Sequence, residues 1–194
     1  MDDASRLTAR RLVERCLHDG EELLWVGRSD PSRMLVDADR YLIPFSAFFL
    51  AFVGWALVAT IRGGANGAVV AILLLFVLAG LHLLGGRFLV KRHRKRTEVY
   101  AVTDRRVFVT NGRRTRETDA RRTDWYVDRT AGHVSVEWDD TRHLDTLFVA
   151  GSESVRQYAN TGLDGFPAPR GNFALYDVAD GDALLAALRR ASGR

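Results

Sequence analysis

The sequence lacks most of the residues that would indicate an enzyme or a disulfide-stabilised protein. It contains one cysteine, Cys16, so no disulfide can form within the chain and a reducing compartment suits it. It contains no Walker loop, no GxSxG nucleophile motif and no GxGxxG dinucleotide-binding motif. We therefore expect a protein that is not an enzyme and that uses no cofactor.

Charged side chains are missing from two long stretches, residues 41–61 and 65–86. As a helix, each stretch would span roughly 30 Å at about 1.5 Å per residue, which matches the hydrocarbon core of a bilayer. The first stretch begins too far into the chain for a signal peptide and lacks its short apolar core and cleavage site. The rest of the chain is too small to bury two such helices in a soluble core, so we predict a transmembrane hairpin over residues 41–86.

The distribution of basic residues predicts the orientation of this hairpin. Only a few residues beginning at Arg62 separate the two stretches, so the helices must be antiparallel and both termini must lie on one side. Nine Lys or Arg residues flank the hairpin on the side of the termini, whereas the loop contains Arg62 alone. Because basic residues stay in the cytoplasm, we predict a multi-pass protein of the inner cell membrane with both termini cytoplasmic.

A basic juxtamembrane segment, residues 87–96, follows the second stretch. Its basic residues are candidates for contact with the membrane and its anionic lipids: Arg87, Lys91, Arg92, Arg94, Lys95 and Arg96. Two roles stay open for them, since the same residues would also fix the orientation and extend toward the headgroups without recruiting any particular lipid. The lipid bilayer is the partner that both roles imply.

The remaining soluble part, residues 97–194, has nearly equal numbers of basic and acidic residues. A nucleic-acid-binding domain is expected to have a basic stripe on its folded surface, so we expect no nucleic acid partner. A group of polar residues resembles a set of metal ligands or a catalytic pair: His133, Glu137, Asp139, Asp140, His143 and Asp145. Their spacing matches no established site, and we interpret them as a solvated sheet face without a metal.

Two elements are predicted ahead of the hairpin. Residues 1–20 contain an amphipathic helix, in which an apolar stripe is flanked by arginines and Gly20 ends the helix. Residues 21–40 contain a strand at Leu23–Gly27 and a turn. An isolated strand would leave its backbone groups and Trp25 unsatisfied, so we expect this strand to dock on the sheet of the domain that follows the hairpin.

Alternation of apolar and polar residues predicts a sheet after the hairpin. The predicted strands are 98–103, 106–110, 123–129, 133–138, 144–150 and 173–178, followed by a helix over 180–191. Asp104 is expected to accept hydrogen bonds from backbone N–H groups of its own turn, and Asn111-Gly112 predicts a hairpin. Residues 151–172 are rich in Gly, Ser, Asn and Pro and are predicted to form a long loop.

Several short motifs resemble one family. These are Leu23-Leu24-Trp25 followed by "GRSDPSR", then "IPFS" from Ile43, "GGRF" from Gly85 and "YAVTDRRV" over Tyr100–Val107. In this order they are similar to membrane-anchored bacterial proteins with a pleckstrin-homology-like (PH-like) domain. The resemblance implies a split β-barrel capped by a C-terminal helix, without enzymatic activity. The expected fold class is an α+β membrane protein with a two-helix transmembrane hairpin and a mostly antiparallel PH-like barrel.

We therefore expect a non-enzymatic integral membrane protein that presents a cytoplasmic PH-like domain for binding or scaffolding at the inner face of the membrane. Its partner would be a protein whose identity the sequence leaves open, and lipid headgroups are the other candidate ligand of the domain. The alternative is a small oligomeric membrane protein that acts through its helices, with Ala47, Ala51 and Gly54 as a close-packing face for a homo-oligomer.

Overall fold

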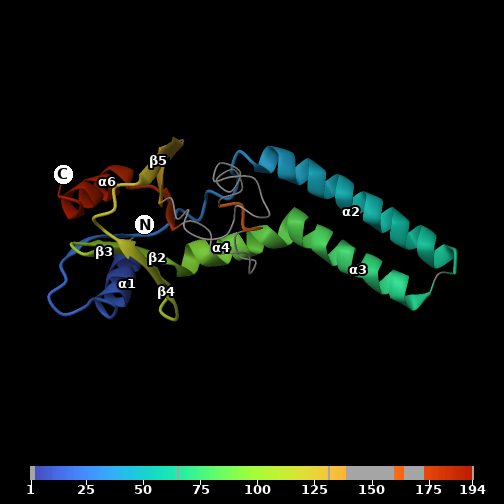
Figure 1. Cartoon of the computed structure of the whole chain (residues 1–194), viewed down its shortest axis with the longest axis horizontal. Helices are drawn as coiled ribbons and strands as arrows, with labels where there is room; N and C mark the ends of the chain where they lie inside the picture. The colour runs from blue at the N-terminus through green and yellow to red at the C-terminus, as the bar shows by residue number, and fades with distance from the viewer. Residues whose placement is uncertain (1–2, 65, 131, 139–159, 164–172, 194) are drawn as a thin grey trace. The chain divides into compact units, whose positions relative to one another are not determined.

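The computed structural model describes residues 3–64, 66–130, 132–138, 160–163 and 173–193. The chain divides into two compact units. Unit 1 contains the described parts of 1–33, 93–153 and 169–194, and unit 2 contains those of 34–92 and 154–168. Figure 1 shows the helices and strands of both.

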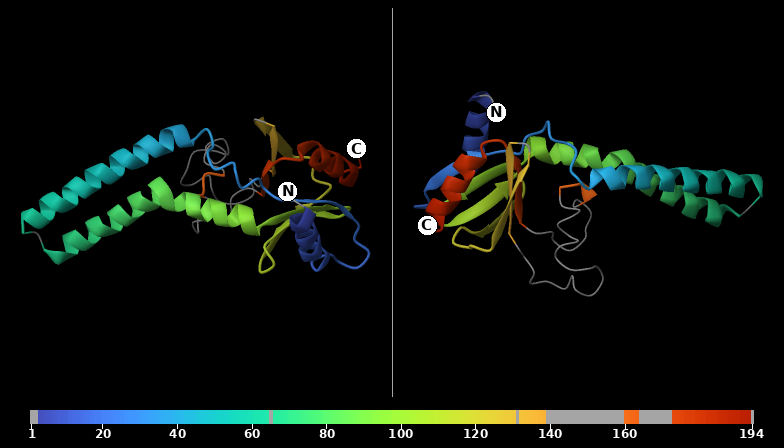
Figure 2. Two further views of the ribbon diagram at one scale, coloured as in Figure 1. Left: turned by 180° about the vertical axis from the view of Figure 1, so that it is seen from behind. Right: turned by 90° about the horizontal axis from the view of Figure 1, so that it is seen from above.

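Unit 2 is built around two long apolar helices. They are α2 (Asp39–Arg62) and α3 (Gly67–Leu81), which continues through a π-helical turn, η1 (His82–Gly86), into α4 (Arg87–Thr97). Asn66 begins α3, because its Oδ1 accepts hydrogen bonds from the backbone N–H groups of Ala68 (2.9 Å) and Val69 (3.2 Å). Figure 2 shows α2 and α3 side by side in both views, as an antiparallel hairpin.

Both helices are long and apolar enough to cross a membrane. In their most apolar stretches only 11% and 6% of the residues are buried, whereas the core helix of a soluble protein would be mostly buried. The observed helices extend beyond the predicted stretches. In particular, α3, η1 and α4 run without a break from Gly67 to Thr97, so the basic residues that follow the second stretch are helical.

Unit 1 contains two antiparallel sheets. The first has the strand order β1-β2-β3-β4 and the second the order β5-β6-β7. The strands are β1 (Leu23–Gly27), β2 (Val99–Thr103), β3 (Arg106–Thr110), β4 (Thr115–Asp119), β5 (Trp125–Thr130), β6 (His133–Trp138) and β7 (Ala174–Val178). The predicted α+β class is thus confirmed.

The two sheets meet at one corner. Ser29, just after β1, forms an isolated bridge with Val178, and the N–H of Asp30 donates to the carbonyl of Asp177 at 2.9 Å. Among the described strands, β4 and β5 each pair with one neighbour only, so these strands do not form a closed barrel.

The four-stranded sheet is covered on both faces, with the helix α1 (Asp3–Glu14) on one side and α6 (Gly181–Ala191) on the other (Figure 1). Val99, Ala101 and Phe108 pack against α1. The other face joins the main core, which includes the second sheet and α6: Tyr100, Val102, Val107, Val109, Val134, Val136, Leu175, Leu184 and Leu188 are among its residues. Because successive side chains point to opposite faces, β2 is buried at every position.

Most predicted elements are present in unit 1. The strand at Leu23–Gly27 is confirmed and docks on the sheet as predicted, where it pairs with β2 and forms one edge. The strand β4 has no counterpart among the predictions, because its five residues, "TRETD", are all polar. The predicted strand 144–150 and most of the loop 151–172 lie outside the described residues.

The prediction for Asp104 was wrong. Its Oδ1 accepts from the backbone N–H of Glu22 at 2.9 Å, at the entrance to β1. The turn between β2 and β3 is held by Thr103, whose Oγ1 accepts from the N–H groups of Arg105 (3.3 Å) and Arg106 (3.0 Å). Both residues have short polar side chains, so the sequence pattern did not distinguish the two roles.

Candidate functional site

The six basic residues proposed for lipid contact lie on two faces of one helix. Arg87, Lys91 and Lys95 follow one another at intervals of four residues, which places them on one side of α4. All three are buried, at 0%, 3% and 5% relative exposure. Arg92 and Arg96 lie on the exposed side. Arg94 is half-buried, and its Nε donates to a carboxylate oxygen of Glu98 at 3.2 Å.

Arg87 holds together the beginnings of α2 and α4 within unit 2. Its guanidinium forms an ion pair with Asp39, in which the two side chains are 0% and 3% exposed. It also donates to the carbonyls of Leu83 (2.7 Å) and Thr161 (3.1 Å). The other oxygen of Asp39 accepts from the N–H of Val36 at 2.8 Å. A buried charge needs such a set of partners, so Arg87 acts as a structural anchor of the helix pair.

Lys91 also turns inward within unit 2. Its Nζ donates to the backbone carbonyl of Met34 at 2.8 Å, ahead of α2. A buried ammonium that binds a carbonyl of its own chain is not presented to a lipid phosphate.

Lys95 is a buried structural residue of unit 1. Its Nζ donates to Asp177 Oδ2 at 2.6 Å and to the carbonyls of Asp30 (3.0 Å) and Arg33 (2.5 Å). Three donors therefore meet three acceptors, which satisfies the ammonium completely. Asp177 itself has a φ of +52°, a conformation that is costly for residues other than glycine. The contacts join the end of α4 to β7 and to the segment that follows β1.

Asp30 belongs to the same group. Its carboxylate accepts from the N–H and Oγ of Ser32 (2.8 and 2.7 Å) and lies 2.8 Å from His133 Nε2. Burial raises the pKa of Asp30, but the hydrogen bonds from Ser32 and His133 lower it more, so that the pKa falls from 3.8 to about 2. Arg33 donates to the carbonyl of Thr130 at 2.6 Å. The residues of this group satisfy one another and have the character of a structural network.

The sequence patterns did not predict the acidic partners of the basic segment. Asp39 is 48 residues from Arg87, and Asp177 is 82 residues from Lys95. No local pattern connects residues so far apart. The spacing of four between Arg87, Lys91 and Lys95 was a usable signal, because it predicts that the three share a helical face.

The described residues contain no group of three or more His, Cys, Asp or Glu side chains that would hold a metal ion. His133 contacts Asp30, and Glu137 lies half-buried on β6. The other four residues considered as ligands, 139, 140, 143 and 145, lie outside the described part of the chain.

Comparison with known proteins adds no relative. No family model matches this chain, and no curated protein matches it. The function is therefore inferred from the residues, their contacts and the motifs around Tyr100–Val107.

Proposed function

We propose that this chain is a non-enzymatic integral membrane protein that presents unit 1 as a PH-like binding domain at the cytoplasmic face of the inner membrane. The observation that carries the proposal is the place of the hairpin in the chain. The two long apolar helices are inserted between β1 and β2, which are hydrogen-bonded neighbours in one sheet. The chain leaves the sheet and returns to the next strand of the same sheet, so both ends of the hairpin belong on one side of a membrane.

The exposed surface of the helices supports a lipid environment. Large apolar side chains on both of them point outward, among them Phe48 (73% exposed), Trp55 (68%), Leu75 (66%) and Leu78 (63%). Soluble monomers rarely expose apolar surface on this scale, whereas hydrocarbon chains solvate it without cost. The excess of Lys and Arg beside the sheet, against Arg62 alone in the loop, supports the cytoplasmic orientation.

The arrangement of unit 1 supports a PH-like domain. A four-stranded and a three-stranded antiparallel sheet meet at Ser29 and Val178, and the C-terminal helix α6 contributes Leu184, Leu185 and Leu188 to the core that both sheets share. A split β-barrel of the PH-like kind likewise consists of two antiparallel sheets followed by a C-terminal helix that caps them. With no enzymatic motif in the sequence, binding of a protein partner is the function that such a domain would serve.

Two experiments test this proposal. After membranes are washed with alkaline carbonate, the full chain should remain in the membrane fraction. Release of the chain into the supernatant would refute the membrane-spanning helices. Replacing residues 34–92 by a short Gly/Ser linker should give a soluble, folded unit 1, because β1, β2 and α1 are all retained. A variant of this kind that aggregates or unfolds would show that unit 1 does not form a binding domain of its own.

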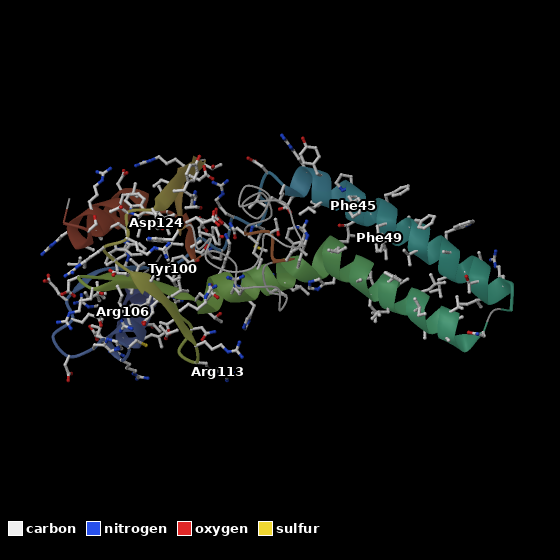
Figure 3. All side chains as sticks on the ribbon, in the orientation of Figure 1. Phe45, Phe49, Tyr100, Arg106, Arg113 and Asp124 are labelled. Carbon is white, nitrogen blue, oxygen red and sulfur yellow. The ribbon has the colours of Figure 1, made fainter. Side chains whose placement is uncertain are left out.

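The alternative is an oligomer that acts through its helices. Ala47 and Ala51 are exposed on α2, and a β-carbon added to Gly54 would meet nothing within 4 Å. Small residues at such spacing allow close helix packing. Phe45 and Phe49, whose ring centroids are 6.4 Å apart (Figure 3), lie on the opposite side of α2, where Phe49 contacts Phe76 of α3 at 6.5 Å between ring centroids. Single-molecule counting in native membrane discs would reveal a fixed stoichiometry that Ala51→Leu abolishes.

A further inference from the structure

The arginines of unit 1 fall into two groups. In one group the guanidinium has a carboxylate partner: Arg10 with Glu14, Arg94 with Glu98, Arg105 with Asp104, Arg106 with Glu21 and Glu117, Arg122 with Asp124, Arg129 with Asp182, and Arg190 with Glu22. The other group includes exposed arginines that form no ion pair within the described part of the chain. Four of these form what we call the basic corner, two at the end of α1 and two in the turn between β3 and β4: Arg11, Arg15, Arg113 and Arg114.

The basic corner lies on two elements that touch each other. α1 is fixed to the sheet by Ala9 and Val13, both fully buried. Leu12 Cδ1 lies 3.1 Å from the position that a β-carbon of residue 112 would occupy, so α1 packs against the turn between β3 and β4. Cys16 Sγ lies 3.9 Å from Thr110 Oγ1, at the end of β3. The helix and the turn that carry these arginines are therefore in contact, although about 100 residues of sequence separate them.

The turn holds its arginines in a fixed position. Asn111 Oδ1 accepts from the N–H groups of Arg113 (3.0 Å) and Arg114 (2.9 Å), and Thr110 Oγ1 accepts from the N–H of Gly112 (3.2 Å). Gly112 has a φ of +81°, which the turn requires and glycine allows. Figure 3 shows Arg113 at the outer end of the β3–β4 hairpin. The guanidinium groups thus extend from a rigid support.

The positive charge of the corner is not compensated locally. The nearest acidic residues along the two elements, Glu14 and Glu117, are already bound to Arg10 and Arg106. Arg11 and Arg15 are four residues apart on the helix, a spacing at which like charges repel each other. Arginines that repel one another on a rigid surface are expected where an anionic group of another molecule binds and neutralises their charge.

We propose that the basic corner docks an acidic segment of a protein partner, a stretch rich in Asp and Glu. Arginine forks bind carboxylates in a bidentate manner, and a fixed array favours a ligand with carboxylates at matching positions. Leu7, 59% exposed on α1, adds an apolar contact to the arginines, a combination typical of protein interfaces. Attraction to a fluid lipid surface requires net charge alone, without fixed spacing. The inference rests on the proposed function, since it names the partner class of unit 1.

The test uses the full chain in discs of neutral phosphatidylcholine and a fluorescein-labelled peptide built of Glu-Glu-Leu triplets. The variant R113E/R114E keeps the backbone bonds to Asn111 and should weaken peptide binding by about tenfold or more. The control R121E/R189E changes the net charge equally at two exposed arginines outside the corner, and should change the affinity by less than about twofold. Equal losses in both variants, or no binding by the unaltered chain, overturn the proposal.

A second arm identifies the source of the anion. A photo-cross-linking amino acid in place of Arg114, in discs that contain phosphatidylglycerol, should cross-link to the added peptide. Cross-linking to lipid with the peptide excluded would show that headgroups occupy the corner, and would overturn the protein proposal. Failure of the proposed membrane function would look different from failure of peptide docking. In that case the chain would stay in solution without discs, independently of whether the peptide binds.

Discussion

At the scale of single residues, Glu21 is a carboxylate whose side chain is completely buried. It accepts hydrogen bonds from the N–H of His18 (2.7 Å), Thr103 Oγ1 (2.7 Å) and the guanidinium of Arg106 (2.8 and 3.0 Å). Burial raises the pKa of Glu21, but these bonds, with Arg106 foremost, lower it from 4.5 to about 2. The charge of Glu21 is thus a part of the folded state.

The depressed pKa of Glu21 predicts how stability depends on pH. The contribution of the carboxylate is complete above about pH 4.5 and is lost as the pH falls through about 2. A shift of this size corresponds to about 3 kcal/mol, so Glu21→Gln should lower the free energy of unfolding at pH 7 by up to that amount. Urea unfolding in detergent, followed by tryptophan fluorescence from pH 7 to pH 2, measures both effects.

The exposed neighbour Glu22 is the matched control for this experiment. Its side chain is 65% exposed and contacts Arg190 at 3.3 Å, so Glu22→Gln should cost less than about 0.5 kcal/mol. A Glu21→Gln variant that keeps the acid sensitivity of the unaltered chain would contradict the assignment.

Thr103 holds the turn that was predicted for Asp104, and Asp104 binds the N–H of Glu22 instead, so substitutions should separate the two roles. Thr103→Val leaves two turn N–H groups and Glu21 without the hydroxyl, and should destabilise unit 1 by about 1–3 kcal/mol. Asp104→Ala removes the bond to the N–H of Glu22 and should cost about 1 kcal/mol. Hydrogen exchange checks the distinction: Asp104→Ala should increase exchange in β1, and Thr103→Val in the turn. The reverse pattern would restore the original interpretation.

At the scale of elements, α4 has one face turned into the protein and one turned out. The buried face holds Arg87, Lys91 and Lys95, whereas Arg92 and Arg96 are exposed. A basic run that looks uniform in sequence therefore divides into buried residues with structural partners and exposed residues. Lipid contact by the exposed ones stays a hypothesis.

This division predicts different results for two substitutions one residue apart. Lys95→Met leaves the largely buried carboxylate of Asp177 without its cation, and should destabilise unit 1 by about 3–5 kcal/mol. Arg96→Met lies on the exposed face and should change stability by less than about 0.5 kcal/mol. Thermal unfolding in detergent measures both. Similar melting of the two variants would contradict the buried role of Lys95.

The helix α6 approaches β6 so closely that glycine is required at its first residue. A β-carbon on Gly181 would lie 2.1 Å from Val134 Cγ2, well inside van der Waals contact. Gly181→Ala should therefore push the helix away from the sheet and cost about 1–3 kcal/mol, despite the better helix propensity of alanine. Ala186→Ser, on the exposed side of the same helix, is the control. A stabilised Gly181→Ala variant would show that the contact relaxes.

At the scale of the whole molecule, the insertion of the hairpin between β1 and β2 ties topology to folding. Because those strands pair with each other, the segments on either side of the hairpin should occupy the same compartment. A reporter active only outside the cytoplasm should be silent when fused after Arg194, and active when inserted at Gly64 in the loop. Activity of the C-terminal fusion would refute the orientation.

The sequence by itself determined the features that depend on local composition. The two uncharged stretches predicted the apolar helices, alternation predicted β2, β3 and β6, and Asn111-Gly112 predicted the β3–β4 hairpin. These patterns succeed because burial and backbone geometry act on neighbouring residues in a periodic way.

The tertiary structure alone decided which charges are buried and which stay free. β4 is a strand because its backbone pairs with β3, although its side chains are polar. Arg87 and Lys95 turn inward because Asp39 and Asp177 arrive from distant parts of the chain, and the arginines of the basic corner gather because α1 packs on the β3–β4 turn. Charge pairing and strand pairing depend on distance in space, and sequence separation does not encode that distance.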